Sequence, residues 1–182
     1  MDILSDKVLM EKVQNGQVDA LSLLYERYKK VLYAYFYNNL GHNANSEDLV
    51  QSVFYKVLKY KHQFSGSGTF KSWMFTIARN ALIDFIRKNK ANSHYAVEDY
   101  SNQLKEAKRA DDRVLKLEDQ KMLREALGQL DQNTRELIVL VKLNEMKYRE
   151  VAEMTGMNES TIKVKVFRGL KSLQTMYQTQ KN

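Results

Sequence analysis

The spacing of apolar residues along the chain predicts helices throughout. In residues 21–36, leucines, tyrosines and a phenylalanine recur every three or four positions, the period of a helix that buries one face. A second such stripe follows in residues 46–58 and a third in about 70–87, with polar, glycine-containing stretches between them. No segment alternates strictly between apolar and polar residues, as a half-buried strand would. The pattern predicts an all-α fold.

The breaks between these helices carry residues that end or begin helices. Gly41 and the polar residues after it end the first helix, because glycine enters the left-handed conformation without a Cβ penalty. Ser46, followed by Glu47 and Asp48, is expected to cap the next helix. Residues 64–69, Phe-Ser-Gly-Ser-Gly-Thr, are predicted to form a flexible loop. Three helices that share an aromatic and aliphatic core form the first predicted domain.

Helical periodicity fails in a polar segment near the middle of the chain, which is predicted to be a flexible linker at residues 91–112. Apolar spacing then resumes, with helices expected to about residue 130 and around residues 134–142. Two more helices follow. We therefore expect two small helical domains, residues 1–90 and 113–182, of which the second is a four-helix unit.

The end of the chain has the pattern of a helix-turn-helix. Ala152, Gly156 and Ile162 stand where this motif needs, in order, a small residue, a turn residue and a buried apolar residue. A helical wheel places Ile162 and Val166 of the second helix toward the core. The opposite side and its flanks carry short, apolar and basic side chains: Ser160, Lys163, Val164, Lys165, Arg168 and Lys171. This composition suits the major groove of DNA, although a solvated amphipathic helix would also show it.

Composition narrows the class of protein. The 182 residues carry a net charge of +7, with basic residues in excess in 1–90 and in 128–182 and a nearly neutral middle. Two basic ends suit two separate contacts with a polyanion. The absence of cysteine excludes disulfides, thiol catalysis and thiolate metal sites. Without a signal-peptide core at the N-terminus or an apolar run of roughly 18 residues, the chain is expected to be cytoplasmic, with no direct membrane insertion.

A second candidate surface for nucleic acid lies on the helix predicted at residues 70–87. One strip of this helix, beside the glycine-containing loop, carries aromatic, polar and basic side chains: Trp73, Thr76, Asn80 and Arg87. Aromatic faces stack on unpaired bases, amides bond base edges and arginine meets phosphate, so the strip suits a single strand. Taken alone, Trp73 is better explained as a core residue.

Three stretches of the chain, in this order, resemble the extracytoplasmic-function group of bacterial sigma factors, the two-domain initiation subunits of RNA polymerase. They are SEDLVQSVFYKVL, FSGSGTFKSWMFTIARNALIDFIRK and LDQNTRELIVLVKLNEMKYREVAEMTGMNESTIKVKVFRGLKSL. The resemblance implies a first domain that binds core RNA polymerase and melts the −10 promoter element, and a second that reads the −35 element as duplex. It also implies an anti-sigma factor as a partner, with no cofactor, metal or catalytic residue.

The resemblance assigns residues to three surfaces by their position in these stretches. The polymerase-binding helix would contain Asp48, Gln51, Val53 and Phe54. The flipped bases of the −10 element would meet Lys56, Phe64, Ser65, Gly66 and Asn80, with Trp73 stacked near the melting fork. The −35 duplex would meet Ser160, Thr161, Lys163, Val164, Lys165 and Arg168.

Three positions depart from the pattern of the family. Asp131 follows Leu130 where the family usually has proline, and an aspartate can cap the helix that begins there. In the last helix, Lys165 replaces a common arginine, which leaves a point charge suited to phosphate rather than to bidentate base reading. Val164 replaces a common serine and faces the groove floor on the wheel, where it would pack on a thymine methyl.

Two other classes of function remain open from the residues alone. A helix-turn-helix transcription regulator with a helical sensor or dimerisation domain would need neither the Trp73 strip nor a polymerase-binding helix. A helical enzyme acting on nucleic acid is disfavoured, because His42, His62 and His94 have no ligand-like spacing and capping explains the acidic residues at the predicted helix starts.

Overall fold

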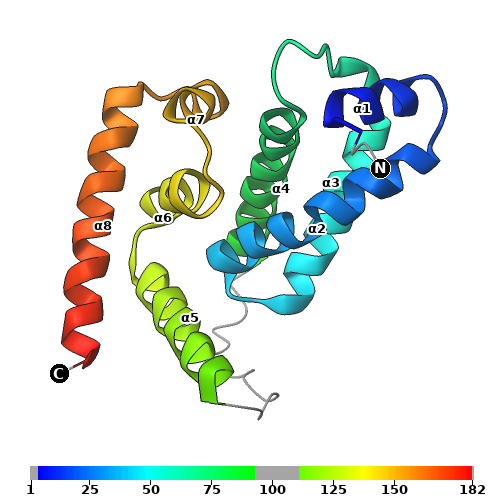
Figure 1. The fold of residues 1–182 in the computed structure, drawn as a ribbon. Coiled ribbons are helices and arrows are strands. Elements are labelled where there is room, and N and C mark those ends of the chain that lie inside the picture. The colour runs from blue at the N-terminus through cyan, green and yellow to red at the C-terminus, as the bar shows by residue number, and fades with distance from the viewer. Residues whose placement is uncertain (1–3, 93–110, 182) are drawn as a thin grey trace. The chain divides into compact units, whose positions relative to one another are not determined.

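The computed structural model describes residues 4–92 and 111–181, and in these ranges every regular element is a helix, which confirms the predicted all-α fold (Figure 1). Two compact units, residues 1–95 and 96–182, divide the chain inside the segment predicted as the linker. Residues 93–110 of that segment lie outside the described ranges. The elements are α1 (Asp6–Gln14), α2 (Asp19–Leu40), α3 (Asn43–Lys59), the 3-10 turn η1 (Lys61–Gln63), α4 (Phe70–Asn92), α5 (Asp111–Gln129), α6 (Gln132–Ile138), the π-helical turn η2 (Val139–Leu143), α7 (Tyr148–Thr155) and α8 (Glu159–Lys181).

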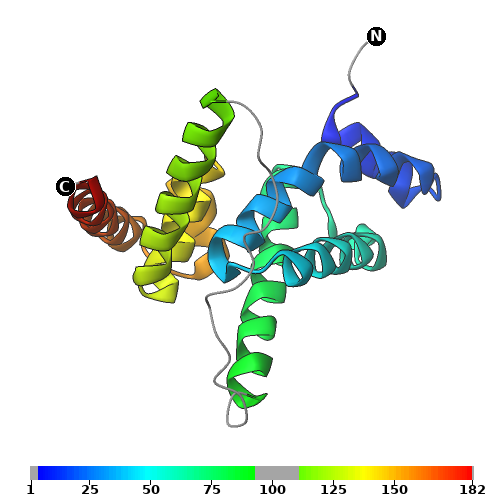
Figure 2. The same ribbon diagram turned by 90° about the horizontal axis from the view of Figure 1, so that it is seen from below.

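An aromatic core joins the helices of the first unit. α2 packs on both α1 and α3, and α3 packs on α4 (Figure 2). At the centre the Tyr35 ring meets Phe75 edge-on at 5.3 Å between centroids and Phe36 at 5.2 Å. All three side chains are fully buried. Edge-to-face contacts of this kind add to the stabilisation that burial of the rings provides.

Helix α1 was not predicted from the apolar pattern. It has only three apolar side chains that are fully buried in the core: Leu9, Met10 and Val13. A polar tie holds α1 to α2, because Arg27 and the Tyr28 hydroxyl both donate to the Asp6 carboxylate. Burial, and then the bond to Asp6, raises the pKa of the Tyr28 hydroxyl, which therefore remains a donor.

The start of α3 corrects one prediction and the end of α2 confirms another. α3 begins at Asn43, after His42, about one turn before the position expected from Ser46. Ser46 is buried inside the helix, where its hydroxyl donates to the His42 carbonyl at 2.6 Å, so the prediction of Ser46 as the cap was wrong. Gly41 ends α2 in the left-handed conformation with φ of 75°, as expected.

Helix α8 organises the second unit, since it packs against α5, α6 and α7. Gly169 marks a very close approach between α8 and α6. A Cβ atom at this position would lie 2.6 Å from Cγ2 of Thr134 and 2.7 Å from Cδ1 of Ile138. These distances are shorter than ordinary contacts between carbon atoms, so this crossing requires glycine.

At the turn between α5 and α6, two side chains form hydrogen bonds with backbone groups at the helix ends. Asp131 caps α6, as predicted, and accepts a hydrogen bond from the Thr134 N–H at 3.0 Å. Arg135 reaches back to the end of α5, where Nε donates to the Leu127 carbonyl and Nη2 to the Gly128 carbonyl, both at 2.8 Å. The two side chains therefore stabilise the turn that brings α6 onto α8.

We predict that Gly169→Ala destabilises the second unit by about 1–3 kcal/mol, because the added methyl group overlaps two side chains of α6. Gly128→Ala on α5 is the matched control, since nothing lies within 4 Å of a Cβ atom there. Alanine favours helix, so the control should keep its stability or gain up to about 1 kcal/mol. Urea denaturation followed by circular dichroism measures both changes. Equal stability of the two variants would contradict the close crossing.

The Asp131 cap leads to a prediction about pH. The Thr134 hydroxyl and then the Thr134 N–H lower the pKa of Asp131, with a smaller contribution from Lys165. The stabilisation is therefore fully present above the ordinary pKa of the carboxyl and is lost as pH falls through the lowered value. Asp131→Ala should cost about 1 kcal/mol of unfolding free energy at neutral pH. In urea titrations the gap to the wild type should narrow as pH falls through the lowered pKa of Asp131, and a constant gap would count against an ionised cap.

Candidate nucleic-acid interface

The first candidate surface is the outward face of α8. Gly156 ends α7 in the left-handed conformation, with φ of 70°, as its place in the motif predicted, and α8 begins three residues later at Glu159. Ile162 and Val166 are buried against the rest of the unit, which also confirms the prediction from the wheel. The side chains turned to solvent in this part of α8 include Ser160, Thr161, Lys163, Val164, Phe167, Arg168 and Lys171. Most residues predicted to meet the −35 duplex are therefore exposed together on one helix.

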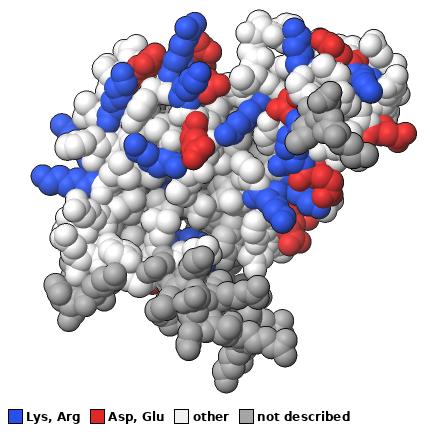
Figure 3. Space-filling view, viewed as in Figure 1, with Lys and Arg blue, Asp and Glu red and all other residues white. Residues whose placement is uncertain are grey.

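The basic side chains of this face differ in their surroundings. Lys163 pairs with Glu159 at 3.7 Å, and its Nζ lies 5.6 Å from the centre of the Tyr148 ring. Lys165 is half-buried and contributes to the lowered pKa of Asp131, whereas Arg168 is exposed. In Figure 3 the Lys and Arg side chains on the α8 side of this unit gather toward the N-terminal half of that helix.

Phe167 is an exposed residue of α8 that the sequence prediction left out. Its side chain is 70% exposed, and Val164, one turn earlier, is 47% exposed. A single exposed apolar side chain is ordinary on a protein surface, but Phe167 and Val164 lie together on the face that also carries the lysines. The same helical wheel places Phe167 between Lys163 and Val164. The spacing in the sequence was therefore enough to place Phe167 on the predicted DNA-facing side. The prediction left it out because the family motif assigns mainly polar and basic residues to DNA.

The second candidate surface begins at an aromatic cluster in the first unit. The Phe64 ring lies 5.4 Å from Trp73 and 6.1 Å from Phe70 between centroids, and Phe64 is only 7% exposed. Trp73 is half-buried at the edge of the same cluster. The structure thus brings Phe64 and Trp73 together, as the sequence suggested, but it turns Phe64 inward, where its face is not open to a base.

The other residues predicted for this surface lie nearer to solvent. Ser65 is exposed, and its hydroxyl lies 2.8 Å from that of Ser67. Gly66 adopts the left-handed conformation with φ of 74°. Asn80 is exposed on α4, and Lys56 is half-buried on α3.

Two residues predicted to bind polymerase are part of the core. Val53 has no exposed surface, and Phe54 is 6% exposed with its ring edge-on to Tyr25 at 5.0 Å. Val53 has no surface to offer a partner and Phe54 has very little, so in this structure both residues hold α3 in place from behind. The apolar periodicity of α3 had indicated this burial, whereas the assignment by family position did not take it into account.

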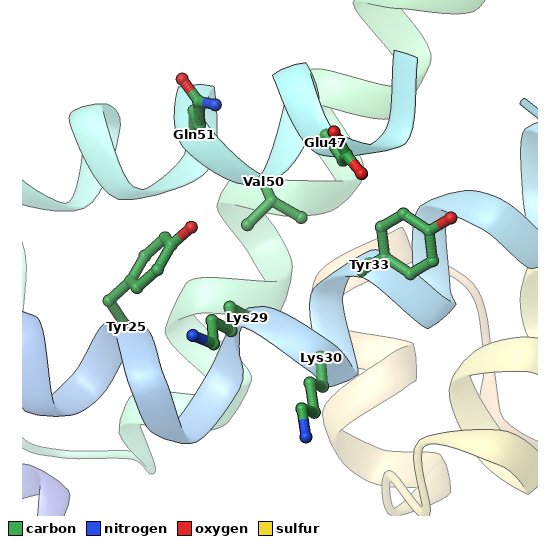
Figure 4. A pocket seen from close by; sticks show the side chains of 7 residues that line it. All are labelled: Tyr25, Lys29, Lys30, Tyr33, Glu47, Val50 and Gln51. Carbon is green, nitrogen blue, oxygen red and sulfur yellow. The ribbon is translucent and has the colours of Figure 1, made fainter. Parts of the chain in front are cut away.

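The outward stripe of α3 consists of Asp48, Gln51 and Tyr55, at helical spacings of three and four residues. Tyr55 is 67% exposed and was not predicted. Gln51 also borders a hollow of about 320 Å³ between α2 and α3 (Figure 4). The residues that line it are Tyr25, Lys29, Lys30, Tyr33, Glu47, Val50 and Gln51.

The part of the chain that the structure describes contains no cluster of three or more histidine or acidic side chains suited to holding a metal ion. Within the same residues, no helix combines the length and the apolar content required to cross a membrane. The features that stand out are thus surfaces of exposed basic, polar and aromatic side chains.

Both candidate surfaces lie in segments that match models of one protein family. Residues 24–92 match sigma-70 region 2, and residues 120–173 match sigma-70 region 4. The chain is 28% identical over 166 residues to the ECF RNA polymerase sigma factor BldN of Streptomyces coelicolor, covering 91% of this chain and 63% of that protein. It is 27% identical over 175 residues to the ECF RNA polymerase sigma factor SigW of Bacillus subtilis, covering 92% and 94%.

The fold is similar to a solved structure of the sigma factor RpoE in complex with the anti-sigma factor NepR from Bartonella quintana. The TM-score is 0.69 at 23% sequence identity, and the likeness covers 90% of this chain and 97% of that one.

The chain belongs to the sigma-70 family of bacterial RNA polymerase sigma factors, in its extracytoplasmic-function group. It is an alternative sigma factor, a subunit that directs RNA polymerase to promoters. A regulator with a helical sensor domain would not account for the match of residues 24–92 to sigma-70 region 2.

Proposed function

We propose that the second unit reads the −35 element as duplex through α8, while the first unit binds polymerase and holds the opened −10 strand. The observation that carries this proposal is the division of α8 into two faces. Ile162 and Val166 are buried, and short, apolar and basic side chains are exposed on the other side. An α-helix of about 10–12 Å diameter fits the major groove of about 12 Å width, so the exposed face meets base edges.

On α8 each exposed side chain has a role that follows from its chemistry. Arg168, with its planar fork of donors, suits a guanine edge. Val164 and Phe167 offer apolar surface to a thymine methyl. Lys163 and Lys165 suit the phosphates on either side, and the hydroxyls of Ser160 and Thr161 suit either a base or a phosphate. The unit therefore combines two kinds of contact, one that positions the helix and one that reads bases.

In the first unit we assign the unpaired strand to the surface beside the 64–69 loop. Trp73 is half-exposed and offers a ring edge and part of a face for stacking, and Asn80 offers an amide to a base edge. Lys56 supplies a cation for phosphate. Phe64 acts by supporting Trp73 from the core, which gives a rigid platform, and it does not itself stack on a base.

We assign polymerase binding to the exposed stripe of α3, with Asp48, Gln51 and Tyr55, and to the hollow beside it. Aromatic side chains that become buried at an interface often dominate its binding energy, which favours Tyr55 as the main contact. The factor would work in the cytoplasm, where polymerase and promoter DNA are found. The likeness in fold to a sigma factor bound to an anti-sigma factor supports an anti-sigma factor as a further partner.

Reconstituted transcription tests the proposed function as a whole. Core RNA polymerase with the full chain is expected to start transcripts from a small subset of a library of promoter fragments, and core polymerase alone is not. Start sites that did not depend on the added chain would contradict the proposal.

Val164→Ser is expected to weaken the preference for thymine at one position of the −35 element by about fivefold, or roughly 1 kcal/mol, because it removes an apolar contact with the methyl group. Binding to duplexes substituted at each position measures the preference. Lys163→Ala is the comparison variant, and it should weaken binding to all duplexes alike and reduce the salt dependence. An unchanged preference in Val164→Ser would show that this side chain does not read the base.

Tyr55→Ala is expected to weaken binding to core polymerase by about tenfold, because it truncates an exposed aromatic group at the proposed contact. Titration of labelled protein with core polymerase measures the affinity, and circular dichroism checks that the fold is kept. Val164→Ser, which changes the other unit, should bind polymerase like the wild type. If both variants bound equally well, the contact would have to lie elsewhere on the first unit.

A further inference from the structure

The C-terminal end of α1 is bonded directly to the segment that leads into the 64–69 loop. Gln14 Nε2 donates to the carbonyls of Lys61 and Phe64, both at 2.8 Å. Lys61 Nζ donates in return to the Val13 carbonyl at 3.0 Å. The three bonds are partly buried. They tie the backbone on both sides of η1 to α1, and so fix the path on which the chain enters the loop.

The other end of α1 carries a lysine to the middle of the same loop. A Cβ atom at Gly66 would lie 3.3 Å from Cε of Lys7 and 3.8 Å from its Nζ. Lys7 is exposed, and within the described residues it makes no ion pair. Of the acidic residues near it on α1, Asp6 is engaged by Arg27, and Glu11 is exposed one turn further on. The ammonium group of Lys7 therefore lies beside the loop and is available to an anion.

We propose that α1 is part of the single-strand surface of the first unit, with Lys7 as a phosphate contact and Gln14 as a positioning residue for the loop. This inference rests on the proposed function of that unit. The occupant is the unpaired strand of the −10 element, because the loop that Lys7 covers starts at Phe64, next to the partly exposed ring of Trp73 on which a base can stack. A lysine beside such a platform meets the backbone of the stacked strand.

The roles of the two residues differ in what they contribute to binding. Lys7 is a point charge without sequence information, so it should add the same attraction for every strand. Gln14 does not reach the strand. Its two hydrogen bonds hold the carbonyls of Lys61 and Phe64 in place. Its loss should therefore loosen the loop and reduce the ratio between the affinities for the −10 sequence and for other sequences.

The test uses holoenzyme assembled from core polymerase and the full chain. The probes are two labelled single-stranded oligonucleotides: the non-template −10 region of a promoter that the wild-type holoenzyme opens, and a scrambled sequence of the same composition. Fluorescence anisotropy gives the affinity for each at several salt concentrations. The variants are Lys7→Ala, Gln14→Ala and, as a matched control on α1, Lys12→Ala. Lys12 borders a different hollow, with Gly16 and Leu23.

Lys7→Ala is expected to weaken binding of both oligonucleotides by about three- to tenfold at low salt. The plot of log K against log salt should become less steep by about 0.7, the value for one phosphate contact on a single strand. Gln14→Ala should reduce the affinity ratio between the two sequences at least about threefold while it keeps the salt slope. Gln14→Glu, which keeps the length of the side chain but lacks both donors, should behave in the same way. Lys12→Ala should match the wild type.

Three results would overturn the inference. If Lys7→Ala kept the affinity and the salt dependence of the wild type, Lys7 would not contact the strand. A loss of holoenzyme assembly with unchanged DNA affinity would mean that Lys7 meets an acidic protein segment instead. Lower thermal stability with an unchanged sequence ratio would make Gln14 a structural residue only. If the wild-type holoenzyme itself did not distinguish the two oligonucleotides, the proposed function of the first unit would fail, and this inference with it.

Discussion

The contact between α6 and α8 at Gly169 determines which side of α8 faces the solvent. With no side chain at this position, α8 lies directly against Thr134 and Ile138, at a distance that leaves no room even for a Cβ atom. Ile162 and Val166 occupy the same side and are buried for the same reason. The basic and apolar face opposite them is therefore presented in one fixed orientation, which is what a helix that reads base edges needs.

In the first unit, too, buried side chains pack behind the exposed residues of each surface and fix their positions. The core places Phe54 behind the outward stripe of α3, where the Tyr25 ring holds it. Phe64 stands in the same way behind Trp73. In both places an aromatic residue that was predicted to make direct contact packs inside, and its neighbour, Tyr55 or Trp73, is the more exposed of the two.

Local patterns were sufficient to predict the helix-turn-helix, because the left-handed glycine at Gly156 and the buried positions of α8 depend on spacing within one short segment. Helix α1 has only three buried apolar residues, so its stability comes from tertiary packing and its pattern is weak. Ser46 was misassigned because a serine hydroxyl bonds equally well to a carbonyl one turn back, and only the structure shows which bond forms. The exposure of Tyr55 and Phe167 depends on the neighbours each helix finds, which the motif alone does not specify.

Two of the three departures from the family pattern, Asp131 and Lys165, are close enough to interact electrostatically. Lys165 contributes to the electrostatic field that lowers the pKa of Asp131, the residue that caps α6. The ammonium group thus has a carboxylate of its own chain as a competitor for any nucleic-acid phosphate. A contact between Lys165 and a phosphate does not depend on the base sequence, so such competition would lower the affinity for promoter DNA and for arbitrary DNA by the same factor. An aspartate at the start of one helix would in this way shorten every stay on DNA, and the contacts with base edges would then decide where the factor remains.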